Sequence, residues 1–181
     1  MTVKECIELT AIQLGIAEEV KAFLRGESED GKKNCELLLA CFNLVENELA
    51  LDYLPLIAED EMQTQTGRIE YSALKRAPVR VTKVTDEWET SIPFKIFPAY
   101  LKTQPGKIRV HYTYSPERKT LESESDFLSS ARLFSYGMAS EYCMATGLFE
   151  EASVWDKKYK EGIESAYRAQ PCARIRSRRW V

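Results

Sequence analysis

The amino-acid sequence predicts an α+β protein with N-terminal helices, a small antiparallel β-sheet or sandwich, a C-terminal helical hairpin and an extended basic C-terminal arm. In the first and last thirds of the 181-residue chain, apolar residues recur every three or four positions, as on a buried helix face. In the middle third they alternate with polar residues, as in half-buried strands. This length is typical of one domain, so we expect residues 1–169 to form a single domain and 170–181 the arm.

Helices are predicted over residues 3–53 in three pieces. Thr2 followed by Glu5 matches a capping box, which places the first helix start at residue 3. The second piece should stop at Gly26, and the third should stop before Pro55, because proline interrupts a helix. The second and third helices are expected at 17–25 and 32–53.

Strands are predicted over residues 56–114, forming an antiparallel sheet or sandwich of about five or six strands. Alternation indicates strands at 79–85, 92–96 and 108–114, and a further hairpin can form from 56–62 and 68–71. Pro93 and Pro98 favour edge or bulge positions, because proline cannot donate a ladder hydrogen bond.

A helical hairpin is predicted over residues 126–168. Ser125 or Asp126 can cap its first helix, and the short connection at Gly147 implies an antiparallel pair. Gly137 lies in the middle of a helix, where glycine is unfavourable. Close approach of a neighbouring helix would explain it, and a tolerated surface glycine is the alternative.

The composition argues against several classes of function. The five cysteines show no Cys-x-x-Cys spacing, so we expect reduced, buried thiols and neither a disulfide framework nor a zinc site. No glycine-rich nucleotide motif and no Gly-x-Ser-x-Gly elbow is present. His111 is the only histidine, and a small hydrolase using it as a base is a remote alternative. We therefore predict no enzyme activity, no catalytic residue, no metal and no cofactor.

Two features argue against a membrane or secreted protein. No window approaches the length of an apolar membrane span. Glu5 stands where a secretory leader would be apolar. The expected compartment is the cytoplasm in which the chain is made.

Charge is segregated along the chain although the total is only −3. Counted from the sequence, the net charge is −9 over residues 1–62, +6 over 63–121, −5 over 122–166 and +5 over 167–181. Blocks of opposite sign suggest surfaces that meet different partners.

The basic C-terminal arm is the strongest candidate binding segment. Its site residues are Arg174, Ile175, Arg176, Arg178, Arg179, Trp180 and Val181. The arm can be a solvated tail, it can bind nucleic-acid phosphates, or it can dock into an acidic groove of a protein. The mixture of arginine with Ile175 and a terminal Trp180 favours the protein groove, because tryptophan commonly anchors interfaces.

Trp88 is a second candidate. It lies between Glu87 and Glu89 in a predicted hairpin tip, where an aromatic side chain is exposed. An exposed tryptophan indicates an interface, so this tip is a possible subunit or tail contact.

Three blocks of sequence resemble the head–tail adaptor (connector) proteins of tailed bacteriophages, particularly those of short-tailed phages and related prophages. They are GRIEYSALKRAPVRV (67–81), then IPFKIFP (92–98) with GKIRVHYTY (106–114), and YGMASEYC (136–143) with GLFEEA (147–152), closed by RRWV (178–181). The likeness extends to the order of helices, β region, helical hairpin and basic tail.

The resemblance implies a non-enzymatic ring beneath the portal at the head–tail junction of the virion. Expected partners are the portal protein, neighbouring copies of the chain, a downstream tail or nozzle protein, and DNA passing through the lumen without sequence-specific binding. Segment 174–181 would reach into portal clefts. Acidic helices would face the lumen, and the basic β region would meet an acidic surface of a neighbour. A nucleic-acid-binding protein and another tail or assembly component remain alternatives.

Overall fold

The chain divides into two compact units, and the residues of each unit chiefly contact one another. The computed structural model describes residues 1–127 and 130–169. The helical unit comprises residues 1–45 and the described chain from 119 onward, and the β unit comprises residues 46–118.

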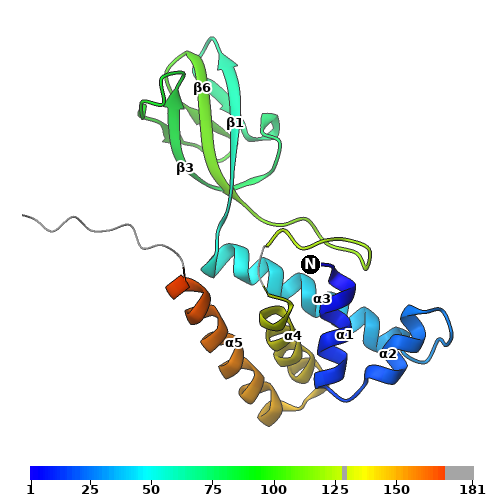
Figure 1. Ribbon diagram of the computed structural model, residues 1–181. Coiled ribbons are helices and arrows are strands. Elements are labelled where there is room, and N and C mark those ends of the chain that lie inside the picture. Colours follow the sequence, from blue (N-terminus) through cyan, green and yellow to red (C-terminus); the bar gives the residue numbers. More distant parts are fainter. Residues whose placement is uncertain (128–129, 170–181) are drawn as a thin grey trace, which may run out of the picture. The chain divides into compact units, whose positions relative to one another are not determined.

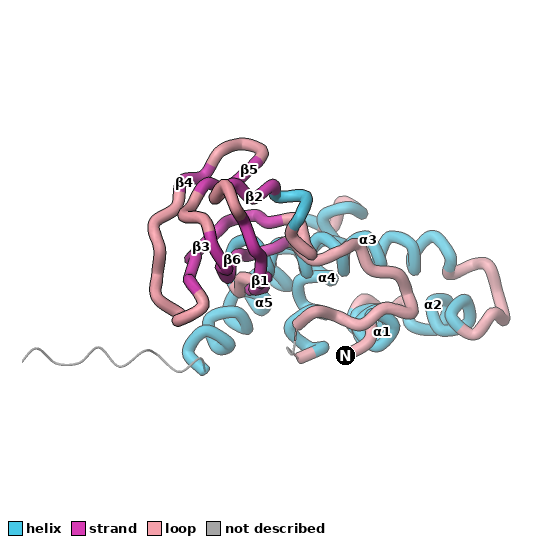
Figure 2. Tube along the Cα trace, turned by 90° about the horizontal axis from the view of Figure 1, so that it is seen from above, coloured by secondary structure: helices cyan, strands magenta, loops and turns pink. Residues whose placement is uncertain are grey.

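The described residues contain five α-helices and two three-stranded antiparallel sheets (Figures 1 and 2). The mixed α+β class predicted from the sequence is therefore confirmed. The single domain expected for residues 1–169 stays a prediction, and the arm at 170–181 lies outside the described residues.

The helical unit packs α4 against both α1 and α5 (Figure 1). The helices are α1 (Val3–Gln13), α2 (Ala17–Leu24), α3 (Lys32–Glu48), α4 (Ala131–Thr146) and α5 (Phe149–Ala169). Phe42 of α3 stacks on Phe134 of α4 with ring centroids 5.1 Å apart. Both rings are fully buried, which joins the N-terminal helices to the C-terminal hairpin in one apolar core.

Helix ends largely follow the predicted signals. The Thr2 Oγ1 accepts the Glu5 N–H at 3.2 Å, and the Glu5 carboxylate accepts the Thr2 N–H at 2.9 Å, which confirms the capping box. Gly147 ends α4 with φ 82°, a left-handed conformation that suits glycine. The long helix changes geometry after Glu48, because its last residues, Leu49–Tyr53, form a π-helical turn.

The predicted start of the helical hairpin at residue 126 is wrong, because α4 begins at Ala131. Ser130 is the actual cap, since its hydroxyl accepts the Arg132 N–H at 3.2 Å. The segment before it pairs with the N-terminus instead: Ser125 donates its N–H to the Met1 carbonyl at 3.1 Å. Thr2 and Glu124 form an isolated antiparallel bridge, so the chain is extended here and α4 begins later.

Gly137 allows close approach inside the helical unit, as one of the two interpretations predicted. A Cβ placed on Gly137 would lie 2.9 Å from Val45 Cγ1 and 3.0 Å from Tyr159 Cε2. These atoms belong to α3 and α5, so the missing side chain lets both helices pack against α4.

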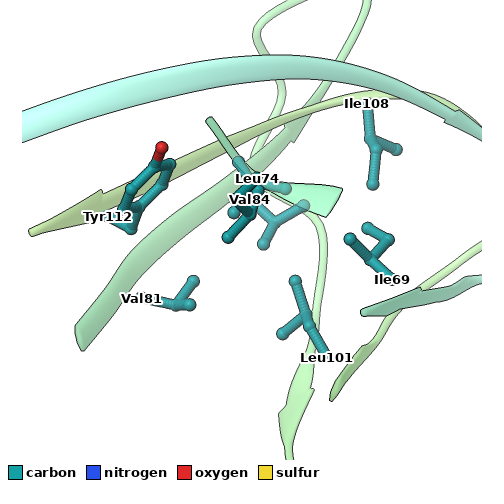
Figure 3. Packing of buried hydrophobic residues seen from close by; sticks show 8 residues of the cluster. Ile69, Leu74, Val81, Val84, Leu101, Ile108 and Tyr112 are labelled. Atoms are coloured by element: carbon teal, nitrogen blue, oxygen red, sulfur yellow. The ribbon is translucent and has the colours of Figure 1, made fainter. Parts of the chain in front are cut away.

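The β unit has strand orders β1-β6-β3 and β2-β5-β4. The strands are β1 (Leu56–Thr64), β2 (Arg68–Glu70), β3 (Pro78–Asp86), β4 (Lys95–Ile96), β5 (Tyr100–Lys102) and β6 (Gly106–Tyr114). Eight buried residues fill the space between the sheets (Figure 3). They are Ile69, Leu74, Val81, Val84, Leu101, Ile108, Val110 and Tyr112.

The predicted hairpin between 56–62 and 68–71 is wrong, although both segments are strands. β1 pairs along its full nine residues with β6, from Leu56 opposite Tyr114 to Thr64 opposite Gly106. Gly67 turns the chain with φ 72°, and its carbonyl accepts the Thr103 N–H at 2.8 Å. That bond directs the short β2 to β5. The longer matched ladder of β1 with β6 is the more extensive pairing.

Candidate partner-binding surfaces

A buried polar cluster fixes the β unit from inside. Asp60 on β1 accepts hydrogen bonds from the Tyr112 hydroxyl and the Lys75 N–H, each at 2.8 Å. The Tyr112 oxygen also accepts the Arg76 N–H at 3.2 Å. Burial raises the pKa of Asp60, but these bonds and the Lys75 ammonium outweigh it and hold the pKa below its ordinary value. The cluster ties the 71–77 loop to the large sheet.

The solvent face of the large sheet carries charge in rows across the strands. Glu59 of β1 and Lys83 of β3 both lie opposite His111 of the central strand. The His111 Nδ1 lies 3.4 Å from a Glu59 carboxylate oxygen. His111 is thus on the polar face, as predicted. Neither of its cross-strand neighbours is a serine, cysteine or aspartate.

Arg109 links β1 to the hairpin tip. Its guanidinium lies 2.6 Å from Glu61 and 3.6 Å from Glu89, and Lys107 lies 3.8 Å from Glu61. The Arg109 hydrogen bond, with help from Lys107, lowers the pKa of the Glu61 carboxyl. Glu61, Glu89 and Lys107 are exposed and Arg109 is partly exposed, so the network contributes chiefly to the charge pattern of this face.

The hairpin tip presents Trp88 to solvent, with 78% of its surface exposed. The Asp86 carboxylate accepts the backbone N–H groups of Trp88 at 2.9 Å and Thr90 at 2.8 Å. Glu89 adopts φ 61°, a left-handed conformation that closes the turn. The exposure expected of Trp88 is confirmed, and Glu87 and Glu89 are exposed beside it. Its role as a subunit or tail interface stays a prediction.

An apolar groove of about 540 Å³ opens beside β3 and β4. Its lining residues are Tyr71, Pro78, Val79, Arg80, Val81, Ile96, Phe97 and Pro98. Val79 is 54% exposed and Ile96 59%, so two large apolar side chains line an open surface. The strand predicted at 92–96 is too long, because only Lys95–Ile96 pair as β4. The groove was missed from the sequence, because it depends on how this short strand lies beside β3.

Three cations align across the small sheet. Arg68 of β2 and Lys95 of β4 both lie opposite Lys102 of β5, and all three are exposed. Arg68 lies 4.1 Å from the centroid of the Tyr100 ring, which stacks on Phe97. The Glu70 carboxylate lies 2.7 Å from the Arg68 guanidinium and offsets part of this charge. Lys95 and Lys102 stay opposite each other, an arrangement that is unfavourable for like charges. This row was also missed, because β5 was not predicted.

The helical unit exposes apolar side chains where α4 turns into α5. Met144, Leu148 and Phe149 are each about half or more exposed, and Phe149 reaches 65%. Four cysteines, by contrast, are buried free thiols: Cys6, Cys35, Cys41 and Cys143. Burial, reinforced by Glu141, raises the pKa of Cys41 to about 12. Reduced, buried thiols were predicted, and these four conform.

The predicted portal-docking residues 174–181 lie outside the described residues. Across residues 1–127 and 130–169, no cluster of three or more His, Cys, Asp or Glu side chains is placed to hold a metal ion. None of the helices in the described chain combines the length and apolarity needed to cross a bilayer. No protein-family model matches the chain, and no curated protein matches it either.

Proposed function

We propose that this chain is a non-enzymatic head–tail adaptor of a tailed bacteriophage. It forms a ring under the portal, docks through its C-terminal arm, and provides a DNA passage and a surface for tail attachment. The observation that carries the proposal is the resemblance of three sequence blocks and of the element order, from the N-terminal helices to the terminal RRWV.

Structural features consistent with this role are surfaces suited to protein contacts. The exposed Trp88 and the apolar groove beside β3 are chemically typical of interfaces, which are enriched in aromatic and apolar groups. The arm adds four arginines and Trp180 within eight residues, 174–181. Arginine forks bind carboxylates in pairs, so an acidic portal cleft is the expected receptor.

Truncation after Gln170 tests the arm. The shortened protein should fold normally and lose capture by portal particles encoded by the same phage or prophage. Trp180→Ala in the full chain should weaken capture at least about tenfold, since a buried tryptophan anchor commonly contributes 2 kcal/mol or more. Val154→Ala, at an exposed apolar side chain of α5 outside these candidate surfaces, is the control and should leave portal capture intact. Unchanged capture by the truncated protein would refute the docking role.

Nucleic-acid binding is the second candidate, and the cation row of Arg68, Lys102 and Lys95 beside Tyr100 favours it. Cationic grooves with aromatic side chains bind single strands with a steep salt dependence. Titration of the full chain with a fluorescent single-stranded oligonucleotide at several salt concentrations measures this binding and its salt dependence. Tight binding lost in Lys95→Glu and Lys102→Glu would support it, and absence of binding at low salt would eliminate it.

A further inference from the structure

The large sheet of the β unit ends in two edges of opposite character. In the described chain, β1 and β3 each pair with β6 alone, so each has one outer edge. The C-terminal part of β3 is covered from Val84 onward, because the Val84 carbonyl accepts the Ile92 N–H at 2.9 Å. The free part is therefore 78–83, and it borders the apolar groove.

The two edges match chemically. β1 exposes Ile57, with 70% of its surface open, followed by Glu59 and Glu61. The free part of β3 exposes Val79 and Lys83. One edge thus offers an apolar residue and carboxylates, and the other an apolar residue and an ammonium group.

The pairing of β1 and β3 with β6 places these groups at matching positions along the strand direction. Ile57 and Arg80 both lie opposite Thr113, and Arg80 directly follows Val79. Two residues earlier on β6, His111 is the cross-strand neighbour of both Glu59 and Lys83.

Rotation about a ring axis moves each copy sideways without shifting it along the axis. If the strands run along that axis, the Glu59 of one copy therefore arrives beside the Lys83 of the next. Its Ile57 arrives beside Val79 and the groove.

We propose that the β units of neighbouring copies join edge to edge, with β1 of one copy against residues 78–83 of β3 in the next. Both strands run antiparallel to β6, so the new contact is a parallel pair. The contact uses two different surfaces, which is the heterologous kind that closes a ring.

Two bulges in β3, between Pro78 and Arg80 and between Val81 and Lys83, interrupt a long regular ladder with any partner, so backbone pairing at this edge is short. Selection of the partner edge then depends on side chains. Glu59 with Lys83 supplies charge complementarity, and Ile57 with Val79 supplies apolar contact. The proposal names a contact for the ring of the proposed function and rests on that ring for its symmetry.

Charge exchange tests the contact in the full-length protein. Native mass spectrometry and light scattering over a range of protein concentrations report self-association. Lys83→Glu alone and Glu59→Lys alone should each weaken it at least tenfold, and the double variant should recover most of the loss because the two charges are exchanged. Lys157→Glu on α5, an exposed lysine outside the β unit, is the matched control and should associate like the wild type. Circular dichroism checks that each variant is folded.

The outcomes separate this contact from the adaptor role. Single variants that associate like the wild type, or a double variant no better than either single one, overturn the edge contact. A wild-type chain that stays monomeric throughout also overturns it. Portal capture is measured on the same samples. A monomer that still binds portal through its arm leaves the docking role standing, and an edge-paired ring that ignores portal leaves the edge contact standing.

Discussion

Tyr112→Phe is the sharpest test of how the β unit is held together. The substitution keeps the buried ring and removes only the hydroxyl that joins Asp60 to the Arg76 N–H. A hydrogen bond to a charged group contributes about 1.5–3 kcal/mol, and a buried amide left without its partner adds a further penalty. We expect the free energy of unfolding of the β unit to fall by about 2–4 kcal/mol.

Hydrogen–deuterium exchange of the β6 amides measures this loss in the β unit alone. Tyr114→Phe is the matched control on the same strand. The Arg76 guanidinium lies over the Tyr114 ring, which the control keeps, so exchange should change by less than about 0.5 kcal/mol.

The same variant should show a characteristic pH dependence. The pKa of Asp60 is lowered in the folded protein, so its stabilising effect is complete above the unfolded pKa and is lost as the pH falls through the folded one. The difference between wild type and Tyr112→Phe should therefore shrink below about pH 4. A loss under about 0.5 kcal/mol at pH 7, or one that persists unchanged at pH 3, would refute the reasoning.

Two further predictions concern the helical unit. Gly137→Ala should destabilise it by about 1–3 kcal/mol, because the new methyl group would overlap Val45 and Tyr159. Denaturant titration measures this loss. Gly162→Ala is the control and should be nearly neutral, because its methyl group would meet only the end of a leucine side chain. Equal losses of stability in the two variants would contradict the packing argument. Cys41, with its pKa raised to about 12, should resist alkylation in the native protein at pH 8 and react after unfolding in urea. Mass spectrometry showing rapid native alkylation of Cys41 would contradict this.

Local signals were read correctly from the sequence because their causes are local. Thr2 with Glu5, and glycine at 147, determine helix ends within a few residues. The exposure of Trp88 likewise follows from a short turn.

Features set by distant partners were not predictable in this way. The start of α4 depends on residue 125 bonding to Met1, far away in the chain. The pairing of β1 depends on which partner offers the longer matched ladder, and alternation alone cannot choose between candidates. The buried Asp60 was not identified, because an aspartate between Glu59 and Glu61 has the sequence of an exposed acidic run, and its Tyr112 partner lies 52 positions away.

The helical unit is discontinuous in sequence, and this has a consequence for synthesis. The Thr10 hydroxyl contacts the Met138 sulfur 128 positions later, whereas residues 46–118 of the β unit are contiguous. On a ribosome the β unit can complete its contacts while α4 and α5 are still inside the exit tunnel or not yet synthesised. The apolar faces of α1, α2 and α3 then stay exposed until nearly the whole chain has emerged. The core of the helical unit can therefore form only when nearly the whole chain has emerged.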